Sequence, residues 1–518
     1  MAYCCAVTLD ALRHSISPAR VGQGLRSDDR TLVWLGAVAI AAVVGAAAAI
    51  APLITVLGAA AIAFGLGLVA SGERSQRCFL LMLAGILVGY AFFSRGFAYL
   101  GVRPVFVGEV VLVAGTWAFI RALPRARFGL PSALILLFMV WGALRTIPYL
   151  GTYGVDALRD GVTWEYAAFA LFVCVFATRR DVGAVVNLYR RLVPLFLVWV
   201  PIATALNFAG VVPTIPGTSV PLIGFKQGDM GVQLAGVAAF LLAGLYGTRS
   251  GRRLIPEAVA WLVWFPEAAI VAAQTRGAML AMAVVGGGLF LVRPSARWFR
   301  TFVIALVVLV AAVALNPGID VGYRRTLSVG QVISNITSVF GDTGNEDLDG
   351  SRAWRLAWWD TIVQYTVNGP YFWTGKGFGI NLADADGFQV GEVGTDASLR
   401  APHNGHMEIL ARSGVPGLAL WVLLNAVWLL MMLRSLVRFR RANDALGTGV
   451  IVWLTLLWGA ALVNAGFDVY LQGPHGGIWF WAVVGLGIAL SRQGPAVPHL
   501  DNPTTGVAAR SPDVATRP

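Results

Sequence analysis

The sequence predicts an all-α polytopic integral membrane protein with about 12–14 transmembrane helices and one large extracytoplasmic loop that contains short helices. Apolar residues make up 57% of the 518 residues and charged residues only 13%, whereas about a quarter of a soluble domain is charged. Apolar runs long enough to cross a bilayer recur along the chain. Between two of them lies one stretch of about 100 residues, and connections of that length are usually functional.

The apolar runs set the expected spans. A bilayer core about 30 Å thick is crossed by about 20 residues of apolar helix. Pro52 marks the turn between the first two spans, which otherwise form one continuous apolar stretch. Up to fourteen spans are expected, at 32–50, 52–70, 78–93, 104–120, 130–147, 164–177, 190–209, 231–247, 256–273, 277–292, 298–315, 415–433, 447–465 and 476–490.

The spans divide the chain into five segments. The N-terminus has mixed polarity and does not resemble a cleavable signal peptide. The C-terminal residues are rich in Pro and Thr, which favours disorder. The expected segments are a cytoplasmic N-terminal segment (1–31), transmembrane helices (32–315), the large extracytoplasmic loop (316–414), C-terminal transmembrane helices (415–490) and a disordered cytoplasmic tail (491–518).

The distribution of charge predicts the orientation. The formal net charge is +12, from 39 basic and 27 acidic residues. Alternate connections, with both termini, hold 26 of the basic residues and nine of the acidic ones, a net charge of +17, and the other side has a net charge of −5. Because basic residues remain on the cytoplasmic side, both termini are expected in the cytoplasm. The use of Arg rather than Lys and the abundant Ala and Gly suggest a high-GC bacterium. The chain would then lie in the cytoplasmic (inner) membrane with the large loop outside, and the basic excess implies no nucleic-acid partner.

Metal and disulfide chemistry are not indicated. The four cysteines show no CxxC and no Cys/His ligand spacing. His403 and His406 form an HNGH sequence, which is not a zinc-binding pattern. We therefore expect no metal site and no cofactor.

The large loop contains one clear helix signal, from Ser351 to Tyr365. Ser351 is a suitable N-cap residue. Trp354, Trp358 and Ile362 repeat at helical spacing, which favours a helix lying on or against the membrane surface. An acidic insertion precedes it, at 341–350, and is expected to face solvent as a hairpin or lid.

Arginines near the outer surface are candidate anion ligands. Arg276 occupies a short outer turn between two spans; it is either an interfacial residue that snorkels or a clamp for phosphate, which a guanidinium binds in bidentate fashion. Arg352 and Arg355 lie one turn apart on the loop helix, and they form either a solvated face or part of the same site. The glycines around Lys376 are more typical of a tight turn than of a phosphate-binding loop.

Histidines and acids supply the remaining candidates. His403 and His406 lie just before an outer helix expected from about Asn404 to Ser413, ended by Gly414. Since histidine accepts a proton near neutral pH, one of the two is a candidate base and the other a structural residue. Acidic side chains in or beside spans also require a partner: Glu109, Glu165, Asp229, Glu267 and Asp468. Lys226 and Asp229 could orient a substrate or cap a helix.

Read together, these motifs resemble the O-antigen ligase family, whose superfamily includes O-antigen polymerases and bacterial protein O-oligosaccharyltransferases. The resemblance rests on Thr275-Arg276-Gly277, the long outer loop, His403-Asn404 and the Gly-x-x-Gly sequence at 414–417. It covers about 224–433. Family ligases commonly have about 12 spans, which is fewer than the fourteen found above.

The resemblance implies a metal-independent membrane glycosyltransferase of surface-polysaccharide biosynthesis, of GT-C-like fold. The family transfers a glycan from an undecaprenyl-diphosphate carrier to an acceptor hydroxyl of a lipid, glycan or protein. Arg276 then matches the arginine that contacts the donor diphosphate, His403 matches the base, and Arg352 or Arg355 matches a second loop arginine. His406, Lys226, Asn404 and Glu267 are possible supporting residues. A single displacement would invert the anomeric centre.

A transporter or flippase that moves a lipid-linked glycan without chemistry is the alternative. Transporters usually place broken or charged helices near the membrane midplane and contain inverted repeats. This sequence shows no internal repeat, and its notable charges lie near the outer surface. The distribution of charge therefore favours glycan transfer, and it leaves the identity of the acceptor open.

Overall fold

The computed structural model describes residues 73–496, apart from 103–104, 216–217, 248–253, 292–295, 316–317, 321–325, 342–345 and 391–398. The predicted N-terminal segment, the spans at 32–50 and 52–70, and the tail from 497 onward lie outside the described residues.

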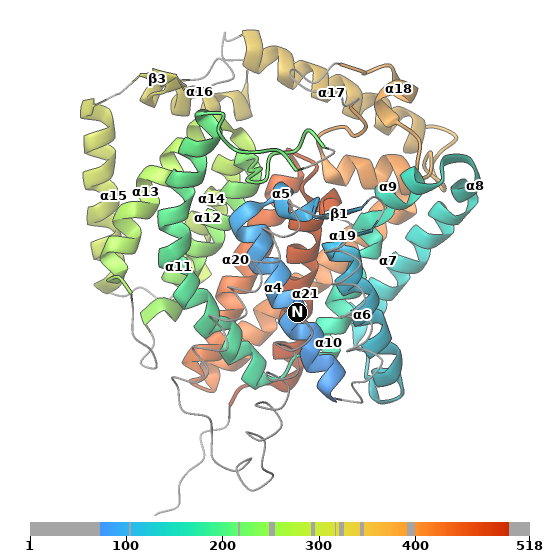
Figure 1. Cartoon of the computed structure of the whole chain (residues 1–518), viewed down its shortest axis with the longest axis horizontal. Helices are drawn as coiled ribbons and strands as arrows, with labels where there is room; N and C mark the ends of the chain where they lie inside the picture. Colours follow the sequence, from blue (N-terminus) through green and yellow to red (C-terminus); the bar gives the residue numbers. More distant parts are fainter. Residues whose placement is uncertain are drawn as a thin grey trace, which may run out of the picture.

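The described residues form an all-α protein, as predicted (Figure 1). Two short antiparallel pairs supply the strands, β1 (Gly101–Val102) with β2 (Val105–Phe106) and β3 (Ile319–Asp320) with β4 (Thr326–Leu327). The α-helices are α4 (Glu73–Phe93), α5 (Arg95–Ala98), α6 (Val107–Ala122), α7 (Leu130–Thr146), α8 (Leu150–Tyr153), α9 (Val155–Glu165), α10 (Ala167–Phe176), α11 (Arg179–Phe208), α12 (Gln227–Leu242), α13 (Glu257–Gln274), α14 (Arg276–Gly287), α15 (Ala296–Leu315), α16 (Val329–Phe340), α17 (Glu346–Thr366), α18 (Leu382–Asp386), α19 (Gly405–Arg441), α20 (Ala445–Ala465) and α21 (Pro474–Gln493). The 3-10 turns are η2 (Leu123–Arg125), η3 (Ile147–Tyr149), η4 (Leu245–Gly247), η5 (Gly288–Leu291) and η6 (Tyr470–Gln472).

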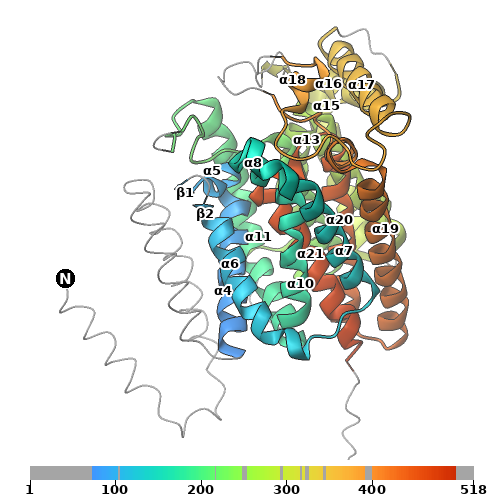
Figure 2. The same cartoon turned by 90° about the vertical axis from the view of Figure 1, so that its right-hand side faces the viewer.

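The long helices run side by side, and the loop helices α16, α17 and α18 lie together at one end of the bundle (Figures 1 and 2). Each predicted span within the described residues coincides with a helix. Seven of the described helices are long and apolar enough to cross a membrane: α4, α6 extended to Arg125, α7 extended to Tyr153, α11, α19, α20 and α21. The chain is therefore a polytopic helical membrane protein.

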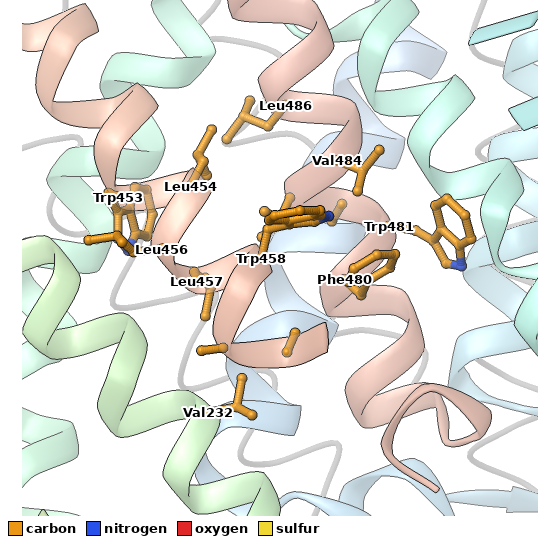
Figure 3. Close-up of a cluster of buried hydrophobic side chains, with 14 of the residues drawn as sticks. Val232, Trp453, Leu454, Leu456, Leu457, Trp458, Phe480, Trp481, Val484 and Leu486 are labelled. Carbon is orange, nitrogen blue, oxygen red and sulfur yellow. The ribbon is translucent and has the colours of Figure 1, made fainter. Parts of the chain in front are cut away.

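Two helices form the centre of the bundle. In α20 and α21, 72% and 89% of the apolar span is buried inside the protein, against 28–39% in the other five. Their large side chains interdigitate with one another and with Val232 of α12 (Figure 3). Trp453 and Trp481 are almost completely buried. Because this centre is filled by α20 and α21, the connections at their outer ends have a fixed position.

Helix α19 is kinked where the sequence predicts a break. Gly414 has a φ of 70° and interrupts the helical backbone, and Pro416 follows it. A Cβ at Gly414 would lie 2.5 Å from Phe372 O, so only glycine fits both the conformation and the space. The helix itself begins at Gly405, ten residues before the predicted span at 415–433. At the other end of the chain, α21 continues to Gln493, so the predicted tail from 491 begins as helix.

The loop helix differs from its prediction. Helix α17 begins at Glu346, before the predicted N-cap Ser351, so the end of the acidic insertion is helical. Trp358 and Ile362 are fully buried against Leu382, Leu399 and other residues of the loop and α19. The expectation that this face covers the membrane surface is therefore corrected: it closes a small hydrophobic core of the loop itself.

Close packing of α21 against α10 is open to a direct test. A Cβ at Gly485 would lie 2.5 Å from Ala170 O, so Gly485→Val must push two central helices apart. We expect a loss of about 1–3 kcal/mol of stability, as in other overpacked cores, measured as a lower Tm in detergent. Gly286→Ala is the control, because nothing lies within 4 Å of a Cβ there. A Tm for Gly485→Val equal to that of the control would contradict this packing.

Candidate functional site

Distant parts of the chain meet at residues 464–468, at the end of α20, which we call the α20 turn. The backbone N–H groups of Phe467 and Asp468 donate to Asn464 O at 2.9 and 3.0 Å and fix its shape. The first residues of α12, α14 and α19 and one face of α17 all contact this turn. The predicted site residues of three separate motifs are therefore brought together at one place.

His403 is held by a carboxylate of the α20 turn. Its Nδ1 lies 3.5 Å from Asp468 Oδ1, and the same oxygen accepts a hydrogen bond from Lys226 Nζ at 3.2 Å. Burial alone would raise the pKa of Asp468, but Lys226 and His403 outweigh it and hold the pKa well below its usual range. An ionised Asp468 favours the His403 tautomer with the proton on Nδ1, which leaves Nε2 as the basic nitrogen.

The backbone and the neighbours of His403 restrict its ring. Its φ is 49°, in the region that side-chain-bearing residues seldom adopt and that often marks a functional position. Trp359 Nε1 donates to Pro402 O at 2.9 Å, and the Trp354 ring lies 6.3 Å from the His403 ring. The imidazole remains partly exposed, with 21% of its side chain accessible. Asp468 and Trp354 therefore restrict the orientation of the His403 ring, and part of the ring remains accessible.

Asn404 and His406 of the HNGH motif are structural. Asn404 Oδ1 accepts from His406 N and Met407 N at 3.0 and 3.2 Å and caps α19. Trp421 Nε1 donates to His406 Nδ1 at 3.1 Å, so the proton of His406 lies on Nε2, 3.1 Å from Leu462 O. Both ring nitrogens of His406 are thus occupied within the protein, and His403 remains the candidate base of the pair.

The Thr-Arg-Gly motif seats the start of α14 against the α20 turn. Thr275 Oγ1 caps the helix by accepting from Ala278 N at 3.2 Å. A Cβ at Gly277 would lie 3.0 Å from both Asn464 Oδ1 and Phe467 Cβ, so glycine is needed for this approach. The threonine and the glycine therefore fix the backbone on either side of Arg276 at the α20 turn.

Arginines from two elements face one another at the start of α14. Burial lowers the pKa of Arg276, the positive charge of Arg352 on α17 lowers it further, and Asp349 acts in the opposite direction. Arg355, one turn further along α17, donates from Nη1 to Phe467 O at 3.2 Å. Two guanidinium groups close enough for the charge of Arg352 to lower the pKa of Arg276 form a site suited to an anion with more than one charge.

Asp229, His475 and Arg95 form a second ion cluster. Asp229 Oδ2 is 3.1 Å from His475 Nε2 and 3.8 Å from Arg95 Nε, and Asp229 and His475 are almost completely buried. Asp229 does not provide the side-chain cap of α12; its charge is compensated by Arg95. Asn464 is also fully buried, and neither polar atom of its amide has a hydrogen bond among the described residues.

Two other candidates are not joined to the site. Glu267 is buried within α13, and its carboxylate makes no hydrogen bond with the described residues. Lys376 is paired with Asp386 and lies 4.2 Å from the centre of the Tyr365 ring. The glycines beside Lys376 have positive φ and contact Arg412, Tyr149 and Tyr153 directly, which agrees with a tight turn rather than a phosphate-binding loop.

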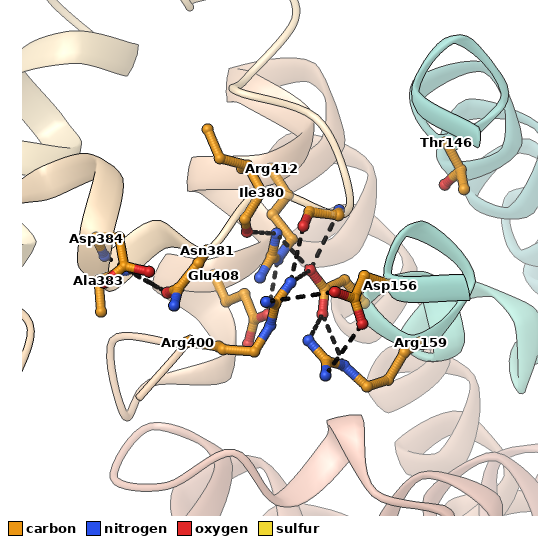
Figure 4. Close-up of polar contacts among 12 residues, drawn as sticks. Thr146, Asp156, Arg159, Ile380, Asn381, Ala383, Asp384, Arg400, Glu408 and Arg412 are labelled. Carbon is orange, nitrogen blue, oxygen red and sulfur yellow. Dashed lines mark hydrogen bonds and ion pairs between the residues drawn. The ribbon is translucent and has the colours of Figure 1, made fainter. Parts of the chain in front are cut away.

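A second set of charges attaches the loop to the bundle (Figure 4). Asp160 of α9 lies 3.1 Å from guanidinium nitrogens of Arg159, Arg400 and Arg412. Arg412 also donates to Glu408 at 2.8 Å and to Ile380 O at 3.1 Å, and Gly379 N donates to Asp160 at 3.2 Å. This network fixes the segment that leads to His403. Within the described ranges, no group of three or more His, Cys, Asp or Glu side chains gathers that could hold a metal ion.

Several of these residues have little signal in the sequence. Asp468 is recognisable only as an acid beside a span, and its partner His403 lies 65 positions away. Asn464, Arg95 and His475 belong to apolar or loop segments without a motif. Their roles depend on contacts between α5, α12, α20 and α21, which a single sequence does not show.

The comparisons agree with the motif-based resemblance. No curated protein matches the chain. The O-antigen ligase family matches residues 258–422, from α13 into α19, a segment that contains Arg276, Arg352 and His403. Residues 258–422 are thus similar to the O-antigen ligase family.

Proposed function

We propose that the protein transfers a glycan from a lipid-linked diphosphate, of the undecaprenyl type, to an acceptor hydroxyl at the outer face of the bacterial cytoplasmic membrane. The proposal rests on one observation above all: His403, oriented by Asp468, stands at the same turn as Arg276. A base for the hydroxyl and a cationic site for the diphosphate are the two elements that such a transfer requires.

The charges at the α20 turn support separate places for donor and acceptor. On the α14 side lie Arg276, Arg352 and Arg355, with Asp349 nearby. On the other side, Lys226 and Arg95 are balanced by Asp468 and Asp229. A diphosphate is stabilised by guanidinium groups, so it belongs beside Arg276. The neutral acceptor hydroxyl belongs beside His403.

The reaction then follows as one displacement. The acceptor oxygen attacks the anomeric carbon and forms the new glycosidic bond while the bond from that carbon to the diphosphate oxygen breaks. His403 Nε2 takes the hydroxyl proton, and Asp468 stabilises the imidazolium. Arg276 and Arg352 stabilise the charge that develops on the departing lipid diphosphate. A single attack from the opposite face inverts the anomeric centre.

Replacement of the base and of its partner should separate their roles. We expect His403→Ala to lower kcat by about 100-fold or more, in the range of general-base catalysis. Asp468→Asn should lower kcat less, because it removes the charge that orients the ring but leaves the ring present. Transfer of glycan from an undecaprenyl-diphosphate donor measures both. Full activity in a folded His403→Ala protein would exclude His403 as the base.

Replacement of the arginine should affect donor use. Arg276→Ala should raise the donor KM and lower kcat, together by at least about 100-fold in kcat/KM, since a charge-assisted contact to phosphate is lost. Arg276→Lys should recover only part of this loss, because lysine cannot bind phosphate in bidentate fashion. Arg77→Ala is the matched control, since Arg77 is exposed and, among the described residues, pairs with Glu73 at 3.6 Å. Equal kcat/KM for the two alanine variants would contradict the donor site.

Metal removal should leave the reaction intact. Because guanidinium groups supply the positive charge at the diphosphate, we expect the rate in excess EDTA to stay within about twofold of the untreated rate. The measurement is glycan transfer before and after chelation, with added Mg²⁺ as a control for restoration. A loss of activity that Mg²⁺ restores would overturn metal independence.

A further inference from the structure

One aromatic side chain of α17 borders both halves of the candidate site. The centre of the Trp354 ring lies 6.3 Å from that of the His403 ring. In the sequence, Trp354 stands between Arg352 and Arg355. The charge of Arg352 acts on Arg276, and Arg355 donates a hydrogen bond to the α20 turn. Trp354 therefore lies where the candidate base and the candidate diphosphate ligands meet.

A buried aromatic pair fixes the orientation of the Trp354 ring. The rings of Trp358 and Phe388 stack with an angle of 4° between their planes and 5.5 Å between their centres. The Trp354 ring lies 5.2 Å from that of Trp358 at 70°, and 6.3 Å from that of Phe388 at 74°. Trp358 is fully buried in the core of the loop, whereas Trp354 packs against this core and is itself partly exposed. Trp354 thus presents part of an oriented ring to the candidate site.

The indole N–H of Trp354 is also unlike those of its neighbours. Trp358 Nε1 donates to Asp386 at 2.7 Å, and Trp359 Nε1 donates to Pro402 O at 2.9 Å. Trp354 Nε1 donates to none of the described residues. Since an indole combines a large apolar face with one polar group, Trp354 can offer both to a molecule that binds beside His403.

The chemistry of the indole face points to a sugar ring. The face carries negative charge and the edge positive charge, so C–H bonds and cationic groups pack favourably above the face. A pyranose ring presents C–H bonds on a face, and its hydroxyl groups can accept from an indole N–H. When a glycosidic bond breaks, the sugar ring also gains positive charge in an oxocarbenium-like transition state. The transferred sugar therefore matches the exposed surface of Trp354 in both states.

The proposed displacement distinguishes the donor sugar from the acceptor. The attacked carbon must lie between the leaving diphosphate, beside Arg276 and Arg352, and the acceptor oxygen at His403 Nε2. Trp354 is two residues from Arg352 and lies beside His403, so it borders this gap. In an in-line attack, the acceptor lies on the opposite side of that carbon from the diphosphate. The donor sugar is thus the ring that has to fill the space next to Trp354.

We propose that Trp354 is the stacking platform for the first sugar of the donor, whose anomeric carbon is attacked. This inference rests on the proposed function and adds to it a residue that contacts the substrate. The indole face holds the sugar against the base and stabilises the positive charge that develops on the ring as the bond to the diphosphate breaks. The subsite takes a pyranose with C–H bonds on one face, and it disfavours an anionic substituent on that face.

A binding measurement separates the sugar from the diphosphate. The probes are undecaprenyl diphosphate and undecaprenyl-diphosphate-N-acetylglucosamine, titrated into His403→Ala protein so that no transfer occurs. Adding Trp354→Ala should raise the Kd of the sugar-bearing probe by about three- to tenfold, as expected for loss of an aromatic contact. The Kd of undecaprenyl diphosphate should stay within about twofold, because the guanidinium groups remain. Trp373→Ala is the matched control, since Trp373 is a 68% exposed tryptophan of the same loop.

An equal rise in both Kd values would mean that Trp354 acts only by positioning the arginines, and it would overturn the proposal. No change in either Kd would overturn it as well. A sugar-dependent change in Kd in a protein whose wild type transfers no glycan would count against the proposed function but not against the sugar contact.

Kinetics of two replacements distinguish the aromatic face from apolar packing. Trp354→Phe keeps an aromatic face and should retain kcat within about threefold, whereas Trp354→Leu keeps only an apolar side chain and should lower kcat by about tenfold. Both side chains can pack against Trp358, so an equal Tm in detergent shows that the loop is folded in each variant. Equal kcat in the two variants would contradict a role for the aromatic face. A change confined to the acceptor KM would assign Trp354 to the acceptor and overturn the proposal.

Discussion

The position of the α20 turn is the constraint on which the candidate site depends. Helices α20 and α21 are buried at the centre of the bundle, so the turn between them has little freedom to move. Lys226, Gly277, Arg355 and His403 each contact it, although they are spread over 178 positions of the sequence. The buried core of the bundle therefore fixes the position of a site whose groups come from the first residues of helices and from a long loop.

The loop needs a second attachment, which Asp160 provides. A buried carboxylate facing Arg159, Arg400 and Arg412 is fully compensated, and it also accepts a backbone hydrogen bond from Gly379. Such a network fixes the position of the loop more than it increases the free energy of unfolding, because desolvation offsets much of the attraction between the charges. Removing one partner would leave an uncompensated buried charge, which typically costs about 3–5 kcal/mol. The network thus fixes the loop on one side of His403, and the α20 turn fixes it on the other.

Spans and motif residues could be predicted from the sequence because they depend on local patterns. Bilayer thickness sets the length of an apolar run, and the need for a cap and a close approach produces Thr275-Arg276-Gly277. The burial of Trp358 and the pairing of His403 with Asp468 could not be predicted in this way. An amphipathic helix face looks the same whether it covers lipid or a small protein core, and the partner of a histidine is decided by tertiary packing. The acidic insertion was misjudged for the same reason, since Asp349 becomes helical and lies close enough to act on Arg276.

Helix α12 gives the site its asymmetry. Its small residues Gly228 and Gly231 let α14 and Asn464 approach on one face, while Lys226 and Asp229 carry charges on the other. Arg276, Arg352 and Arg355 gather where α14 and α17 meet, whereas on the opposite side Lys226 is paired with Asp468 and Arg95 with Asp229. Under the proposed function, this difference would distinguish an anionic donor from a neutral hydroxyl before any specific contact with a sugar is made. The overall charge of +12 does not show this difference between the two faces of α12.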